Sequence, residues 1–146
     1  MGRIEEAKQS YEKEVEIYEK LLETDPENVA YRSDVAMTLN NLGALLSDMG
    51  RIEEAKQRYE KALEIYEKLL ETDPLNVSDE ADEAITVNNL GNLLSNMGRI
   101  EEAKHRYEKA REIYEKLLEN YLINTSYAYD ATISIHIIST TILQTT

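Results

Sequence analysis

The sequence contains no cysteine, no tryptophan and no phenylalanine, and its 146 residues include only two prolines and five glycines. Without cysteine, the chain forms no disulfide bonds, thiolate nucleophiles or zinc-thiolate sites, and we expect a reducing compartment, the cytoplasm. Uninterrupted apolar runs of about 18 residues are also missing, so we expect no segment that spans a membrane.

Basic residues are scarce as well. There are 16 Lys and Arg against 29 Asp and Glu, which gives a formal net charge of −13. A nucleic-acid-binding domain needs a basic stripe that attracts phosphates, and an anionic membrane surface selects for the same feature. The charge balance therefore argues against DNA, RNA and membranes as partners.

What the sequence does contain is an internal repeat with a period of 48 residues. Residues 1–48 and 49–96 are identical at 35 of 48 positions, and residues 97–120 match residues 49–72 at 21 of 24 positions. Agreement at this level indicates duplication of one structural unit.

Each period contains two stretches whose apolar residues recur at intervals of three and four, the spacing of amphipathic helices. Gly50 and Gly98 are placed to end helices, and Pro26 and Pro74 are placed near the start of the next ones. The two apolar rows of one period are Val35, Leu39, Leu42, Leu46 and Met49, then Ala55, Tyr59, Ala62, Tyr66 and Leu69. The pattern predicts a repeat array over residues 1–120, with helices at about 3–24, 28–48, 52–72, 78–96 and 100–120.

The repeat resembles the tetratricopeptide family. The family pattern W-x2-L-G-x2-Y, A-x3-F and P is matched here by Leu39-x2-Leu42-Gly43-x2-Leu46, Gly50, Ala55-x3-Tyr59, Ala62 and Pro74. The period of 48 exceeds the usual value of about 34 by one heptad in each helix, as in the longer repeats of kinesin light chains. The resemblance implies an all-α, right-handed superhelix of about six long antiparallel helices.

The tail, residues 121–146, has a different composition, rich in Ile and Thr. A shift of 48 residues aligns Ile135, Ile138 and Ile142 with Val87, Leu90 and Leu94, so the buried positions of a first helix are retained. We interpret residues 126–144 as a degenerate first helix that caps the array, and the composition leaves a strand or a disordered tail as alternatives.

The array begins with the second helix of a unit, so residues 3–24 have no preceding partner helix in the sequence. Glu14 stands where the later repeats have Ala62 and Ala110. A carboxylate is tolerated at such a contact only if that face meets water or another subunit. We therefore expect an open N-terminal edge, and the alternative function is self-association into a homo-oligomer through Glu14, Ile135, Ile138 and Ile142.

Catalysis is not expected from these residues. The two histidines, His105 and His136, lack partners for a metal site or a nucleophile and base pair. Most acids fit helix surfaces, as in the i to i+4 pairs of Glu64 with Lys68 and of Glu112 with Lys116. The cluster of Asp79, Glu80, Asp82 and Glu83 fits the N-terminal end of a helix, where the dipole favours acids. We predict a protein that is not an enzyme and uses no cofactor and no metal.

The candidate binding residues lie on the first helices. By the family resemblance, positions flanking the Leu-Gly pair line a concave surface, and Asn88, Asn92 and Asn96 form a ladder of carboxamides along one face. A carboxamide both donates and accepts, so such a ladder can bind the backbone of an extended peptide. The predicted peptide-binding residues are Asn40, Asn41, Ser47, Asn88, Asn89, Asn92 and Asn96.

The predicted guest is a neutral or basic segment of a protein or peptide. No Lys or Arg occupies the concave positions, and Asp48 would repel a carboxylate. Asparagine as a simple polar filler remains the alternative. The small cost of Asn in a helix favours a binding role.

Overall fold

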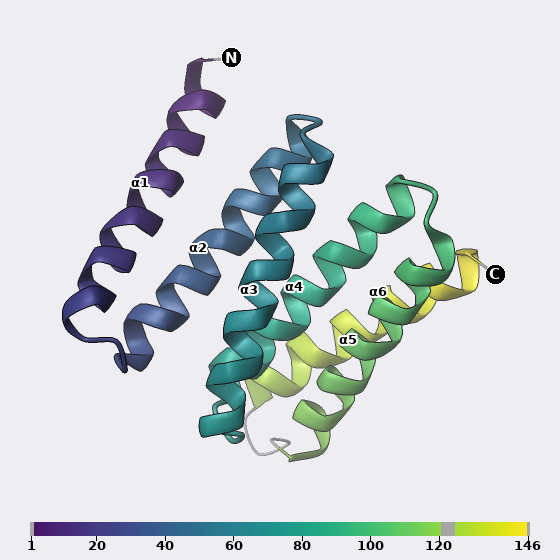
Figure 1. The fold of residues 1–146 in the computed structure, drawn as a ribbon. Helices are drawn as coiled ribbons and strands as arrows, with labels where there is room; N and C mark the ends of the chain where they lie inside the picture. Colours follow the sequence, from purple (N-terminus) through teal and green to yellow (C-terminus); the bar gives the residue numbers. More distant parts are fainter. Residues whose placement is uncertain (1, 121–124, 146) are drawn as a thin grey trace. The chain divides into compact units, whose positions relative to one another are not determined.

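The structure is a computed structural model that describes residues 2–120 and 125–145, with the side chains of 125–131 outside that description. The described chain is all-α, and within each of its two compact units successive helices run antiparallel (Figure 1). The expected all-α architecture of six helices is confirmed. They are α1 (Gly2–Thr24), α2 (Val29–Asp48), α3 (Ile52–Thr72), α4 (Val77–Asn96), α5 (Ile100–Asn120) and α6 (Thr125–Thr145).

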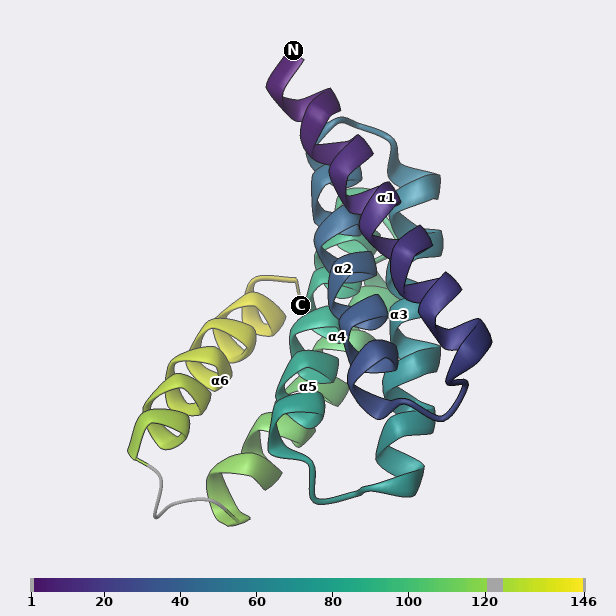
Figure 2. The same cartoon turned by 90° about the vertical axis from the view of Figure 1, so that its left-hand side faces the viewer.

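The chain divides into two compact units. Unit 1 comprises Met1–Pro74 and unit 2 comprises Leu75–Thr146. In unit 1, α1 packs against α2 and α2 against α3; in unit 2, α4 packs against α5 and α5 against α6 (Figures 1 and 2). Among the described helices, none is long and apolar enough to cross a membrane.

Glycine ends two of the helices, as its position in the sequence indicates. Gly50 and Gly98 both have φ of +77°, the left-handed conformation that side chains with a Cβ disfavour. At Gly50, the amide of Arg51 donates to the carbonyl of Leu46 at 2.8 Å, and the amide of Gly50 donates to Ser47 at 3.0 Å. These two bonds form a Schellman motif, which satisfies carbonyls at the end of α2.

Asparagine, and not proline, caps the start of α2 and α4. The side-chain oxygen of Asn28 accepts from the amide of Tyr31 at 3.0 Å, and that of Asn76 accepts from the amide of Asp79 at 3.0 Å. Each bond satisfies one of the four amides that a helix start leaves without an internal partner. Pro26 and Pro74 lie just before these caps, in the turns.

The core consists of the two apolar rows that the periodicity identifies. The second-helix rows of α3 and α5 are buried in full, and the first-helix row of α2 is buried except for Met49 at its C-cap. Small and large side chains alternate along the buried rows of α3 and α5. The buried members are Ala55, Tyr59, Ala62, Tyr66 and Leu69 in α3, and Ala103, Tyr107, Ala110, Tyr114 and Leu117 in α5.

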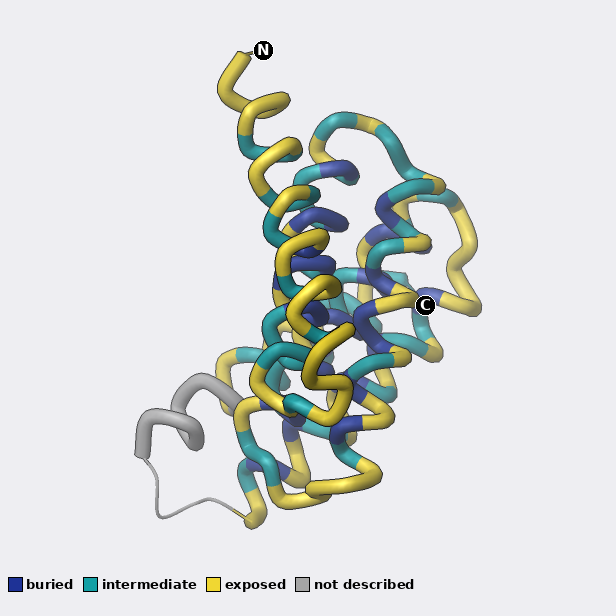
Figure 3. Tube along the Cα trace, turned by 60° about the vertical axis from the view of Figure 1, so that its left-hand side comes forward, coloured by how far each residue is buried: buried dark blue, intermediate teal, exposed yellow. Residues whose placement is uncertain are grey.

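The helix α1 is much less buried than its repeat equivalents. Only Val15 of α1 is buried, and most of this helix is exposed or half-buried (Figure 3). Its contact with α2 centres on Val15 together with the partly buried Tyr18 and Leu22. Near-identical sequences therefore occupy different environments in α1 and α3.

Candidate peptide-binding surface

A close contact between a glycine and a tyrosine joins the two helices of each repeat. A Cβ atom added to Gly43 would lie 2.7 Å from Cε1 of Tyr59, and one added to Gly91 would lie 2.8 Å from Cε1 of Tyr107. Real Cβ atoms do not approach carbon so closely, so only glycine fits at these positions. The contact brings each tyrosine against the polar face of the preceding helix.

In unit 2 this contact also orients one of the predicted binding residues. The Tyr107 hydroxyl donates to Oδ1 of Asn92 at 2.7 Å, and it also has a hydrogen bond with the Ser95 side chain. Asn92 itself remains exposed on α4. This hydrogen bond holds the Oδ1 atom of Asn92 in place, and the NH2 group of the same side chain can donate to another molecule. Sequence reasoning missed this bond, although the repeated Gly-Tyr spacing was the signal that could have found it.

The predicted asparagines lie on two helices, one in each unit. In unit 2, Asn92 and Asn96 are exposed, whereas Asn88 and Asn89 are half-buried. In unit 1, Asn41 is exposed, and Asn40 and Ser47 are half-buried on α2. The ladder belongs to α4, because α2 has Ala44 and Asp48 where α4 has Asn92 and Asn96. The binding role of these residues stays a prediction.

The residues predicted for self-association differ in accessibility. Ile138 is buried, whereas Ile135, Ile142 and Glu14 are half-buried. Over residues 132–145 of α6, whose side chains the structure describes, the large exposed apolar ones are Ile133, Ile137 and Leu143. Self-association through these helices stays a prediction, and the burial of Ile138 indicates that this residue serves the packing of the chain itself.

The buried tyrosines of the two repeats differ in their polar surroundings. Burial, followed by the charge of the nearby Asp48 carboxylate, raises the pKa of Tyr59 to about 12. Burial also raises the pKa of Tyr107, and its hydrogen bond with Ser95 works in the opposite direction. The change from Asp48 to Asn96 therefore removes a negative charge from the neighbourhood of the second tyrosine.

The raised pKa of Tyr59 predicts an alkaline loss of stability. An unfolded tyrosine loses its proton near pH 10, whereas the folded Tyr59 keeps it until about pH 12. The unfolded state thus binds fewer protons across this window, and the free energy of unfolding should fall as pH rises through it. Urea denaturation at successive pH values should show a smaller fall in Tyr59→Phe than in the wild type.

The matched control for that experiment is Tyr11→Phe, which removes a hydroxyl from the equivalent position of α1. Lysines titrate in the same range, and the comparison between variants removes their common contribution. If the free energy of unfolding fell equally steeply with pH in Tyr59→Phe and in the wild type between pH 10 and 12, the raised pKa of Tyr59 would be contradicted.

The acidic cluster at the start of α4 lies at the helix terminus, as predicted, but three of its members are buried. Glu80 Oε1 lies 2.8 Å from Lys116 Nζ, and Glu83 Oε1 lies 3.5 Å from Lys109 Nζ. Asp79 is buried beside them, and burial followed by the Asp79 charge raises the pKa of Asp82. Among the described residues, no group of three or more His, Cys, Asp or Glu is placed to hold a metal ion.

Comparison with known families agrees with this geometry. Residues 35–75 and 84–120 match one model of the tetratricopeptide repeat, and residues 1–28 match a second model with the same description. The chain belongs to the tetratricopeptide repeat family. Tetratricopeptide repeat domains generally mediate protein–protein interaction and are typically non-catalytic. No curated protein matches the sequence.

One solved structure with this architecture is that of BtubC (BKLC) from P. vanneervenii. The two chains are 22% identical, and the TM-score is 0.50. The match covers 94% of this tetratricopeptide repeat chain and 56% of BtubC, so the chain spans a little over half the length of that protein. At this identity the likeness shows a common fold.

Proposed function

We propose that this tetratricopeptide repeat chain is a non-catalytic scaffold that binds an extended peptide along the asparagine face of α4. The face is formed by Asn88, Asn92 and Asn96, which recur every four residues on the helix. The observation that carries the proposal is the 2.7 Å hydrogen bond from the buried Tyr107 to the exposed Asn92.

That bond supports binding because it orders a surface side chain in advance. Tyr107 is held against Gly91 and is 1% exposed, so its hydroxyl is a rigid anchor for the Asn92 carboxamide. A preorganised group loses less conformational entropy when it binds than a mobile one does. The NH2 end of Asn92 can then donate to a backbone carbonyl of the guest, whatever the guest's side chains are.

Charge favours a neutral or basic guest. The chain has a net charge of −13, and no Lys or Arg lies among the predicted binding residues of α4. An acidic peptide would be repelled over the range of the Debye length, about 8 Å at physiological salt. On α2, the equivalent polar residues Asn40, Asn41 and Ser47 form a candidate surface of unit 1 by itself, to which Asp48 contributes a negative charge.

The test is a binding screen with an array of synthetic ten-residue peptides, half neutral and half basic. For peptides captured by the wild type, we expect Asn88→Ala with Asn92→Ala to weaken binding by about ten- to a hundredfold, because two hydrogen bonds are lost. Fluorescence anisotropy measures the affinity, and circular dichroism verifies that the helix content is unchanged.

Two further variants sharpen the test. Tyr107→Phe keeps every asparagine but removes the anchor of Asn92, so it should weaken binding by a smaller factor than the double variant. Asn120→Ala removes a carboxamide from the exposed end of α5 and should leave the affinity unchanged. If the double variant binds the captured peptides as tightly as the wild type, the asparagine face is not the binding surface.

A further inference from the structure

One side of α6 is exposed and carries no formal charge. Its large apolar side chains are Ile133, Ile137 and Leu143, which are 42%, 55% and 76% exposed. The exposed His136 and Thr140 lie between them in the sequence, and all five recur at intervals of three or four residues, so they share one side of the helix. We call this side the outer face of α6. No Asp, Glu, Lys or Arg occurs in residues 131–146.

The packing of α6 within the chain does not use the outer face. The helix packs against α5, and Ile138, on the opposite side of α6, is only 2% exposed. At the position of Ile137 the earlier repeats have Asn41 in α2 and Asn89 in α4. An exposed apolar patch in place of polar residues is the mark of an interaction surface. A membrane is a poor partner for it, because no Lys or Arg rims the face.

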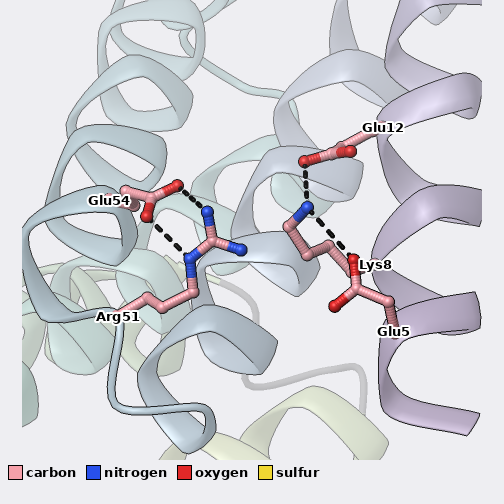
Figure 4. A network of polar contacts seen from close by, with 5 residues as sticks. All are labelled: Glu5, Lys8, Glu12, Arg51 and Glu54. Atoms are coloured by element: carbon pink, nitrogen blue, oxygen red, sulfur yellow. Dashed lines mark hydrogen bonds and ion pairs between the residues drawn. The ribbon is translucent and has the colours of Figure 1, made fainter. Parts of the chain in front are cut away.

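The net charge limits where two copies of the chain can touch. Each copy carries −13, so two copies repel unless uncharged surfaces meet. The helix α1 does not offer such a surface, since Figure 4 shows its Lys8 lying 3.6 Å from Glu5 and 3.1 Å from Glu12. The exposed Ile4 and Ile17 of α1 also have acids as sequence neighbours. On the outer face of α6, by contrast, a second copy meets no like charge.

Head-to-tail stacking of α6 on α1 of another copy is unfavourable. Within the chain, Ala62 of α3 and Leu39 of α2 belong to one buried cluster. If α6 of one copy preceded α1 of the next as α2 precedes α3, the equivalent residues would be Ile135 and Glu14. Burying the Glu14 carboxylate against an isoleucine has a large desolvation cost. A symmetric pair of α6 helices avoids that cost.

We propose that two copies of the chain pair through the outer faces of their α6 helices, antiparallel about a two-fold axis. Ile133 and Leu143 lie five residues on either side of position 138, so Ile133 of one copy is level with Leu143 of the other. Ile137 of both copies lies beside the axis. The antiparallel direction is favoured because it opposes the two helix dipoles. The face is smaller than a standard interface, so the dimer is weak, with a dissociation constant of about 10–500 μM.

Sedimentation equilibrium of the full chain from about 5 μM to about 1 mM tests the pairing. We expect the mass to rise from 16.8 kDa toward twice that value. Ile137→Asn, which installs the residue of the earlier repeats, should weaken the dimer by at least about tenfold, because the change occurs twice in the pair. The matched control is Ile17→Asn, at a residue of α1 that is 48% exposed, and it should leave the dimer unchanged. A wild type that stays monomeric at about 1 mM, or equal effects of the two variants, would overturn the proposal.

Cross-linking tests the antiparallel arrangement. The chain has no cysteine, so one introduced cysteine is the only thiol. In an antiparallel pair centred on position 138, the two residues 137 are about 3 Å apart along the axis and the two residues 133 about 15 Å apart, at 1.5 Å per residue. Ile137→Cys should therefore form a covalent dimer under mild oxidation with copper phenanthroline, whereas Ile133→Cys and the control Ile17→Cys should not, since a disulfide spans less than about 7 Å between Cα atoms. Efficient dimers of Ile133→Cys would contradict the antiparallel direction.

The pairing is independent of the asparagine surface. Asn88→Ala with Asn92→Ala changes α4 and should leave the sedimentation profile unchanged. Ile137→Asn should in turn leave the affinity for captured peptides unchanged when that affinity is measured at about 1 μM protein, where the chain is monomeric. Loss of the dimer in the double alanine variant would show that the interface is not the outer face of α6.

Discussion

Replacing Gly91 by alanine should destabilise unit 2 by about 1–2 kcal/mol, although alanine is the better helix former. The new Cβ would lie 2.8 Å from Cε1 and 2.9 Å from Cδ1 of Tyr107, whose ring is almost completely buried and cannot move aside. Overpacking of this kind costs about 1–3 kcal/mol, while the gain in helix propensity returns about 0.5–1 kcal/mol. Urea denaturation followed by circular dichroism at 222 nm measures the net loss.

A double-mutant cycle verifies the cause. With Tyr107→Leu already present, the ring is gone, and Gly91→Ala should become neutral or stabilising, so the sign of its effect reverses. Gly43→Ala should reproduce the loss in unit 1, because its added Cβ would lie 2.7 Å from the Tyr59 ring. Gly2→Ala is the control, since nothing lies within 4 Å of the added Cβ. A loss at Gly91 that persists in the Tyr107→Leu background would show that the ring contact is not responsible.

Replacing Lys116 by methionine should cost about 1–3 kcal/mol, because it leaves the buried Glu80 carboxylate without its cation, although the Lys116 side chain itself is 55% exposed and water screens part of the interaction. Glu80 is only 4% exposed, and its Oε1 lies 2.8 Å from Lys116 Nζ. Methionine retains most of the length and packing of the lysine stem but leaves the carboxylate buried without its cation. The free energy of unfolding should be measured in urea, because guanidinium chloride would screen the charges.

The repeat supplies its own control for this experiment. Lys68 occupies the equivalent position in α3 and pairs with Glu64 at 3.1 Å, but both side chains of that pair are about two-thirds exposed. Exposed helix pairs contribute about 0.3–0.5 kcal/mol, so Lys68→Met should have little effect. Adding Glu80→Gln to Lys116→Met should recover part of the loss. Equal effects of Lys116→Met and Lys68→Met would contradict the role assigned to the buried carboxylate.

Two lysines at the same repeat position can therefore form different ion pairs. The sequence alone does not predict this difference. Lys68 and Lys116 stand at the same repeat position, and the i to i+4 pattern predicts an exposed pair for both. The structure also connects Lys116 to Glu80, a residue 36 positions away whose counterpart in unit 1 is Arg32. Sequence periodicity describes neighbours on one helix, whereas this contact depends on how α4 and α5 pack.

The candidate binding residues illustrate the same division. The spacing of Asn88, Asn92 and Asn96 predicts a shared helix face, because residues four apart lie one turn above another. That Asn92 accepts a hydrogen bond from Tyr107 depends on the approach of α5 to Gly91. Likewise, Lys61 of α3 pairs with Glu19 of α1 at 3.2 Å, a contact over 42 positions that the spacing along either helix does not predict.

The absence of cysteine, the shortage of basic residues and the repeat of 48 already determined much about this protein: an all-α tetratricopeptide array whose helices end at Gly50 and Gly98. Those properties follow from local chemistry, namely apolar spacing along a helix and the backbone freedom of glycine. Only the tertiary structure decided that Asn92 is anchored by Tyr107, that Glu80 is buried against Lys116 and that Lys61 pairs with Glu19. Each of these depends on side chains from different helices meeting at distances that repeat spacing alone does not specify.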